Sequence, residues 1–137
     1  MTINQNVVTL WNNGIDKFCL FSVPDDTHYN YITGKPCITF GVFYESERYK
    51  GYDTFTLFDS HYTDLINTID ETYYCLNGTF RLYDMGADTD GYIDFEMCKG
   101  KLYIKGQLGA SFSSHSLKFS FEADQALLKS LMQSISV

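Results

Sequence analysis

Residues 92–108, YIDFEMCKGKLYIKGQL, combine two alternating runs of side chains with a tight turn between them. In the second run, Leu102 and Ile104 alternate with lysine and tyrosine, which is the pattern of a β-strand with one face in solvent. Lys99-Gly100 supplies the turn. Two strands joined by so short a connection must pair antiparallel. The stretch therefore predicts an antiparallel hairpin.

Strand-like runs continue on both sides of this hairpin. Apolar or alternating runs occupy residues 16–23, 37–44, 52–58, 79–84, 92–98, 101–108 and 117–121. Residues 7–11 form either a short edge strand or a loosely held arm. Pro24-Asp25-Asp26 is expected to end the first run, and a polar loop follows it up to Pro36.

Two stretches have the spacing of amphipathic helices. Apolar residues recur at steps of three and four over residues 62–76 and again over residues 127–135. Asp59 or Ser60 is the expected cap of the first helix, and Asp124 is the expected cap of the second. Because both helices need a sheet to cover their apolar faces, the expected fold is α+β. It consists of one curved antiparallel sheet of about seven strands with two helices packed on it.

Length and charge narrow the class of protein. The 137 residues are the length of one domain, residues 1–137. Ten Lys and Arg stand against 17 Asp and Glu, which gives a formal net charge of −7. This balance argues against binding to nucleic acid or to an anionic membrane surface, because both attract basic proteins. The first ten residues show no secretory signal, and no apolar run reaches 18 residues, so we expect a cytoplasmic protein.

No pattern in the chain predicts catalytic residues, a metal site or a cofactor. The four cysteines, Cys19, Cys37, Cys75 and Cys98, include no CxxC pair and have no histidine at a zinc-ligand spacing. We expect them to be free and mostly buried thiols. Asp59-Ser60-His61 and Ser114-His115-Ser116 are short clusters, but adjacent residues on a loop seldom converge on one point. We therefore expect a protein that is not an enzyme.

The turn around Gly91 carries a dense group of acids. Asp84, Asp88, Asp90 and Asp94 surround this glycine, in a sequence similar to the middle of a calcium-binding loop. The first and twelfth positions of such a loop would lack carboxylates, and the flanks alternate as strands rather than as helices. Two explanations stay open: a hairpin turn that uses Asp and Gly for its geometry, and an acidic surface for a basic partner.

Four segments of the second half of the chain carry a family resemblance. They are GTFRLYD at 78–84, DTDGYIDF at 88–95, LYIKGQLG at 102–109 and LKFSFEADQ at 117–125, followed by a leucine-rich helix. Together they resemble WapI-type immunity proteins, which are small bacterial antidotes to polymorphic or contact-dependent growth inhibition toxins. The resemblance spans residues 78–132. It implies a cytoplasmic, non-catalytic protein that binds and blocks the C-terminal domain of one cognate toxin.

The composition is compatible with that role. Aromatic residues make up 17% of the chain, and many of its 11 tyrosines lie close in sequence to acids. Tyrosine gives contact area at low entropic cost, and acids attract a basic partner such as a nuclease toxin. The alternative is that the tyrosines only cover the sheet faces. The expected toxin-binding residues are Asp64, Asp70, Glu71, Tyr83, Asp84, Asp88, Asp90, Tyr92, Asp94 and Glu96.

Two other classes of protein stay open. A small ligand-binding protein or enzyme would use a pocket on the concave face of the sheet, beneath the helices. A structural module would form a homo-oligomer through a large apolar contact. A monomer is the favoured state.

Overall fold

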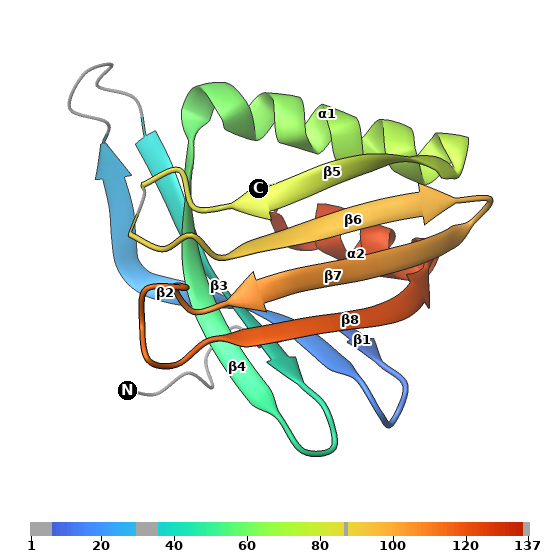
Figure 1. The fold of residues 1–137 in the computed structure, drawn as a ribbon. Coiled ribbons are helices and arrows are strands. Elements are labelled where there is room, and N and C mark those ends of the chain that lie inside the picture. Colours follow the sequence, from blue (N-terminus) through green and yellow to red (C-terminus); the bar gives the residue numbers. More distant parts are fainter. Residues whose placement is uncertain (1–6, 30–35, 87, 136–137) are drawn as a thin grey trace.

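The computed structural model describes residues 7–29, 36–86 and 88–135 (Figure 1). In chain order the elements are β1 (Val7–Asn12), β2 (Lys17–Tyr29), β3 (Pro36–Glu45), β4 (Lys50–Phe58), α1 (Asp59–Cys75), β5 (Asn77–Tyr83), β6 (Tyr92–Cys98), β7 (Lys101–Leu108), β8 (Leu117–Asp124) and α2 (Gln125–Ile135). Every strand pairing in these ranges is antiparallel. The eight strands and two helices found there confirm the α+β class.

The strands form two four-stranded sheets, where the sequence predicted one sheet of about seven strands. Within each sheet the spatial order follows the chain, β1-β2-β3-β4 and β5-β6-β7-β8, because short turns pair each strand with the one before it. The prediction of a single sheet was wrong because α1, with its 17 residues, interrupts the run of hairpins and carries the chain to a second sheet. Residues 7–11 belong to the edge strand β1 rather than to a loose arm.

β2 is longer than the sequence predicted. It continues to Tyr29, so Pro24-Asp25-Asp26 does not end it. The pairing of β2 with β3 shifts register between Ser22 and Thr27. Such an irregularity tolerates a proline, which has no backbone N–H to donate to the ladder. The second half of the expected loop, residues 30–35, lies outside the described residues.

The two helix starts differ in how they are capped. α1 begins at Asp59 with Phe58 in the N-cap position, so neither Asp59 nor Ser60 is its cap. Asp124 does cap α2, because its carboxylate accepts a hydrogen bond of 2.8 Å from the backbone N–H of Ala126. The cap predicted for the second helix is therefore confirmed, and the caps predicted for the first are wrong.

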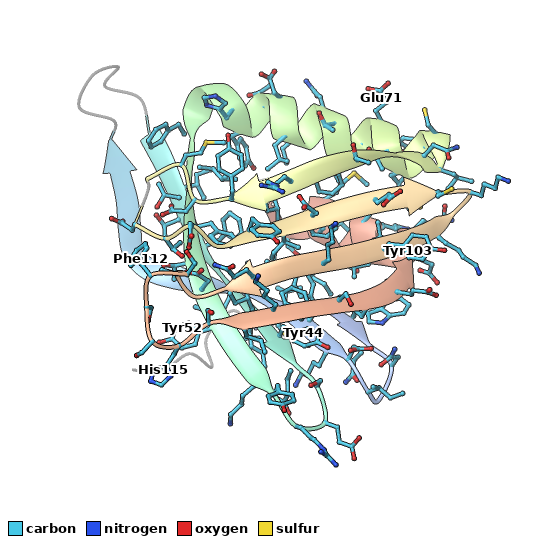
Figure 2. All side chains as sticks on the ribbon, in the orientation of Figure 1. Tyr44, Tyr52, Glu71, Tyr103, Phe112 and His115 are labelled. Carbon is cyan, nitrogen blue, oxygen red and sulfur yellow. The ribbon has the colours of Figure 1, made fainter. Side chains whose placement is uncertain are left out.

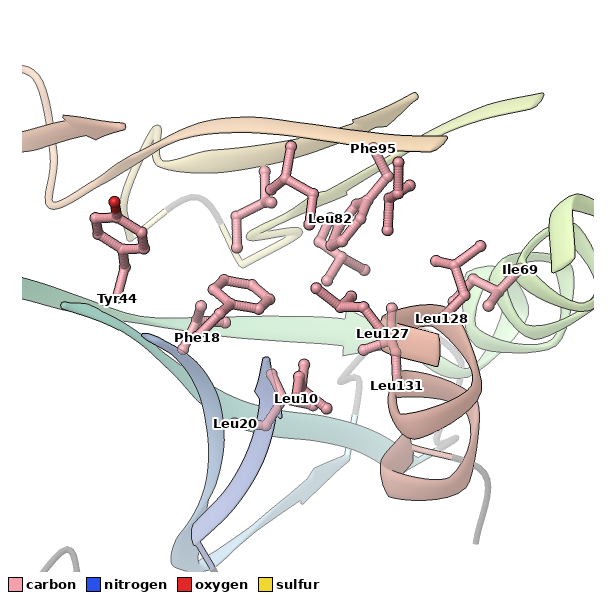
Figure 3. Packing of buried hydrophobic residues seen from close by; sticks show 14 of the residues in the cluster. Leu10, Phe18, Leu20, Tyr44, Ile69, Leu82, Phe95, Leu127, Leu128 and Leu131 are labelled. Atoms are coloured by element: carbon pink, nitrogen blue, oxygen red, sulfur yellow. The ribbon is translucent and has the colours of Figure 1, made fainter. Parts of the chain in front are cut away.

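The core lies between the two sheets, and the helices close one end of it (Figure 3). Phe18 of β2 meets the rings of Phe95 in β6 and Phe121 in β8, with centroids 6.4 and 5.7 Å apart. At the closed end, Ile69 of α1 and Leu128 of α2 are fully buried close to one another (Figure 3). Each fully buried side chain of this size contributes roughly 2–3 kcal/mol through the hydrophobic effect. These contacts hold the sheets and helices in one core.

Candidate functional site

β4 crosses the strand ends of the second sheet (Figure 1), and we name this junction the β4 seam (residues 51–58, 84–86, 88–91 and 109–117). At one end, the side chain of Leu117 packs over Gly51. Further along β4, the carboxylate of Asp53 accepts hydrogen bonds from the backbone N–H of Gly109 at 2.9 Å and the hydroxyl of Thr89 at 3.0 Å. One strand of the first sheet thereby fixes the loops at the end of the second.

Asp84 anchors the other end of the β4 seam. Its side chain is only 8% exposed, and its two carboxylate oxygens accept four backbone hydrogen bonds. The N–H groups of Thr56 and Gly86 donate to Oδ1 at 2.9 and 3.2 Å. Those of Asp88 and Thr89 donate to Oδ2 at 2.8 and 3.2 Å. Because Asp84 is buried and satisfied, it holds the turn in place and offers no free surface to a partner.

Asp90 holds a second loop, residues 109–116, which we name the presenting loop. Its carboxylate accepts hydrogen bonds from the backbone N–H of Ser111 at 2.7 Å, from the Ser111 hydroxyl, and from the amide of Gln107 at 3.2 Å. The bonds from Ser111, and to a smaller degree that from Gln107, lower the pKa of Asp90 below its ordinary value. Asp90 therefore stays ionised and keeps the presenting loop attached to the turn.

Phe112 stands on the presenting loop with 78% of its surface exposed. Figure 2 shows it at the end of the second sheet where the β4 seam lies. The backbone N–H of Ser113 donates to the carbonyl of Ala110 at 2.9 Å, which closes a turn around Phe112. The sequence interpretation missed this residue. Its signal was one large apolar side chain within a run of small and polar residues, ASFSSHS at 110–116.

The β4 seam is negatively charged around Phe112. It contains the four carboxylates of Asp53, Asp84, Asp88 and Asp90, of which three accept the hydrogen bonds described above. Asp88 is exposed, and no described residue donates a hydrogen bond to its carboxylate. Hydrogen bonding does not cancel these charges, so the seam keeps a negative potential toward solvent.

The exposed side of α1 carries a second acidic surface. Asp64, Asp70 and Glu71 are exposed along the helix, and Tyr74 near its end is 73% exposed. Figure 2 shows Glu71 on the outer side of α1, away from the sheets. α1 contains no lysine or arginine. All three acids are exposed, and their contact with a toxin stays a prediction.

The outer face of the second sheet differs from the predicted acidic surface. Arg81 makes a bidentate ion pair with Asp94 at 2.6 and 2.9 Å, and its guanidinium lies 4.4 Å from the ring centroid of Tyr92. The hydrogen bonds that Arg81 donates to the carboxylate of Asp94 raise the pKa of Arg81. Glu96 is exposed and pairs in register with Tyr103 of β7. This face therefore mixes both signs of charge.

The ten predicted site residues thus fall into three places rather than one. Asp64, Asp70 and Glu71 lie on α1; Asp84, Asp88 and Asp90 lie in the β4 seam; and Tyr83, Tyr92, Asp94 and Glu96 lie on the second sheet. Asp84 is wrong as a contact residue because it is buried. Asp90 and Asp94 are occupied by neighbours in the same chain.

The alternative of a pocket beneath the helices has no support in the described residues. The faces of the two sheets that the helices adjoin are filled by core side chains such as Phe18, Phe55 and Phe95. A depression of about 580 Å³ does occur on the opposite, outer face of the second sheet. Its polar lining includes Arg81, Glu96 and other exposed strand residues.

The groups considered for catalysis or metal binding lie apart. His61 is exposed on α1, and His115 is exposed on the presenting loop. Of the cysteines whose side chains are described, Cys19 is buried but Cys75 and Cys98 are exposed, so the expectation of mostly buried thiols is wrong for these two. In the described ranges, no group of three or more His, Cys, Asp or Glu side chains could hold a metal ion. The same ranges contain no helix with the length and apolar character needed to cross a membrane.

Comparisons with known proteins add no identification. No family model matches the chain, and no curated protein or solved structure matches it. The function must therefore be inferred from the chain's own residues.

Proposed function

We propose that this chain is an immunity protein that binds and blocks the C-terminal domain of a cognate bacterial toxin, with a basic nuclease domain as the target. The observation that supports the proposal is the segregation of charge onto two acidic surfaces, α1 and the β4 seam, neither of which contains a lysine or arginine. Residues 59–98 contain nine acids and one base, which leaves eight acids and nine bases for the rest. The acids are Asp59, Asp64, Asp70, Glu71, Asp84, Asp88, Asp90, Asp94 and Glu96, and the base is Arg81.

Such segregation has a direct physical consequence for binding. A surface of one sign attracts an oppositely charged partner over about a Debye length, which is ~8–10 Å at physiological salt. It raises the association rate well above the ~10⁵–10⁶ M⁻¹s⁻¹ of neutral protein pairs. An inhibitor of a toxic enzyme benefits from fast capture, because every free toxin molecule is active until it is bound.

The proposal places the exposed carboxylates of the β4 seam, Asp88 and Asp90, and those of α1 against basic residues of the toxin. Asp88 is the seam acid best suited to contact a partner, because it is exposed and no described residue donates a hydrogen bond to it. On α1, Asp70 and Glu71 are exposed, and the helix contains no lysine or arginine. A mechanism of this kind needs no cofactor or metal, since occlusion of the toxin is sufficient.

The test uses the C-terminal domain encoded by the reading frame directly upstream, purified as an inactive variant. We expect nanomolar binding that weakens steeply as salt rises, and protection of cells that express the active domain. Asp88→Lys and the double variant Asp70→Lys, Glu71→Lys should each slow association by about tenfold at low salt if their surface faces the toxin. Glu47→Lys, on the exposed β3–β4 hairpin, changes the charge by the same amount as Asp88→Lys, so it is the control for that variant and should leave the rate within about twofold.

The outcomes separate clearly. Absence of binding and of protection would contradict the immunity function. Binding that does not change between low and high salt would contradict electrostatic capture. A change in one variant and not the other would identify which of the two acidic surfaces contacts the toxin.

A further inference from the structure

Phe112 is the exception among the phenylalanines of this chain. The other ten are buried or half-buried, whereas Phe112 is 78% exposed. Burial of a phenylalanine side chain is worth roughly 2–3 kcal/mol, and an exposed ring gives up most of that gain in the isolated protein. The core therefore does not explain why the presenting loop carries this side chain.

Hydrogen bonds to carboxylates of the β4 seam hold the presenting loop at two residues. Ser111, the residue before Phe112, is bound by Asp90 through both its backbone N–H and its hydroxyl. Gly109 at the start of the loop is fixed by Asp53 at 2.9 Å, and its φ of +86° favours glycine there. The ring is thus displayed on a backbone that is already ordered before any partner arrives. Ordering in advance reduces the entropic cost of binding.

The negative charges near Phe112 restrict which kind of partner can bind over its ring. Asp90 and Asp53 hold the presenting loop directly, and the exposed Asp88 and the buried Asp84 add two more carboxylates to the β4 seam. An anionic membrane surface would be repelled by these charges. A second copy of this chain would bring two acidic seams together, which also costs energy. A basic protein would be attracted by the carboxylates of the seam, and an apolar pocket on that protein would bury the ring of Phe112.

We infer that Phe112 is the anchor of the interface, inserted into an apolar pocket of the toxin domain whose rim is basic. The inference rests on the proposed function. It adds that the contact made by Phe112 slows dissociation of the complex. The seam carboxylates act at long range on the association rate, while Phe112 acts at contact on the dissociation rate. A large aromatic in a desolvated pocket, with charged groups around it, is typical of interface hot spots.

The first experiment measures binding kinetics of the full chain to the inactive upstream-encoded toxin domain. We expect Phe112→Ser to weaken binding by about 100-fold, mainly through faster dissociation, with little change in the thermal midpoint. That loss should be the same at low and high salt. Tyr49→Ser is the matched control, because Tyr49 is a 64% exposed aromatic on the β3–β4 hairpin, and its affinity should stay within about twofold of wild type.

The second experiment tests whether the ordered loop matters apart from its charge. Ser111→Ala keeps every carboxylate but removes the hydroxyl bond to Asp90, and we expect binding to weaken by about threefold to tenfold. Asp90→Asn weakens the same attachment and also removes one charge, so its effect should be larger at low salt than at high salt.

The outcomes distinguish this inference from the proposed function. If the wild-type chain binds the toxin domain and Phe112→Ser binds equally well, the anchor is wrong and the immunity function stands. If the wild-type chain does not bind at all, both are overturned. Sedimentation velocity and flotation with phosphatidylcholine vesicles test the other occupants. A dimer or a vesicle-bound fraction that disappears in Phe112→Ser would assign Phe112 to that contact and overturn the inference.

Discussion

Asp84 and Asp88 are four residues apart and carry the same side chain, yet their surroundings are opposite. Asp84 is buried and accepts four backbone hydrogen bonds, one of them from Thr56, which is 28 residues away in the chain. Asp88 is exposed and uses only its backbone N–H in this network. The two residues should therefore respond very differently to the same substitution.

We expect Asp84→Asn to lower the free energy of unfolding by about 2–3 kcal/mol, because an amide group would face N–H donors that then lack an acceptor. Asp88→Asn is the matched control and should change stability by no more than about 0.5 kcal/mol. Urea denaturation of the two variants and the wild type measures both values. Equal stability of the two variants would show that Asp84 does not anchor the turn.

Sequence patterns alone could place Asp84 beside a turn, but could not tell that it is buried. That distinction depends on β4 passing over the turn, which is a long-range contact. The exposure of Phe112 depends on the same kind of information, because an aromatic in a short loop can also fold back onto the core. The residues of the β4 seam were therefore the hardest part of the candidate site to predict.

At the level of elements, the predictions succeeded where the pattern is local. The bounds of β6 and β7 match the predicted runs, since alternation and the Lys99-Gly100 turn define both strands. Lys99 and Gly100 both have positive φ, 52° and 84°, as a tight two-residue hairpin turn requires. The division into two sheets was not predictable in this way, because it depends on how α1 redirects the chain. The continuation of β2 past Pro24 was missed because the pairing with β3 shifts register between Ser22 and Thr27, where a proline is tolerated.

The pairing of β2 with β3 requires a residue without a Cβ at one position, Gly41. Gly41 of β3 lies opposite Phe21 of β2, and a Cβ added at Gly41 would overlap the Phe21 ring. Because Phe21 is buried over the glycine, we expect Gly41→Ala to destabilise the protein by about 1–3 kcal/mol. Thermal and urea unfolding measure this loss. Gly86→Ala is the control, since its added Cβ would meet no atom closer than 3.4 Å.

A double-mutant cycle isolates the cause of that loss. In a Phe21→Ala background the ring is absent, so Gly41→Ala should cost less than about 0.5 kcal/mol. If Gly41→Ala costs the same in both backgrounds, the overlap with Phe21 is not the reason for the glycine.

At the scale of the whole molecule, the two sheets are joined at two different kinds of contact. The β4 seam joins them through carboxylates and backbone N–H groups. Away from the seam, an aromatic stack joins β3 to β8, with Tyr44 lying nearly parallel to Phe119 at a centroid distance of 4.4 Å. The hydroxyl of Tyr44 donates a hydrogen bond to Asp16, the residue before β2. The contacts of the β4 seam are polar, and the stack of Tyr44 on Phe119 is apolar. We therefore expect the two contacts to be lost under different conditions.

The aromatic stack should limit stability in alkali. Burial, the hydrogen bond to Asp16 and the negative charge of Asp16 together raise the pKa of Tyr44 from 10.0 to about 12. Because the folded state holds this proton more tightly than the unfolded chain, the stability it contributes is complete below pH 10 and is lost as pH rises toward 12.

We expect Tyr44→Phe to be about 1 kcal/mol less stable than wild type at pH 8, through loss of the hydrogen bond. Urea unfolding from pH 8 to pH 11.5 should then show this difference shrinking as the wild type alone loses the contribution of Tyr44. Parallel curves for the two proteins over that range would contradict a buried, proton-holding Tyr44 between the sheets.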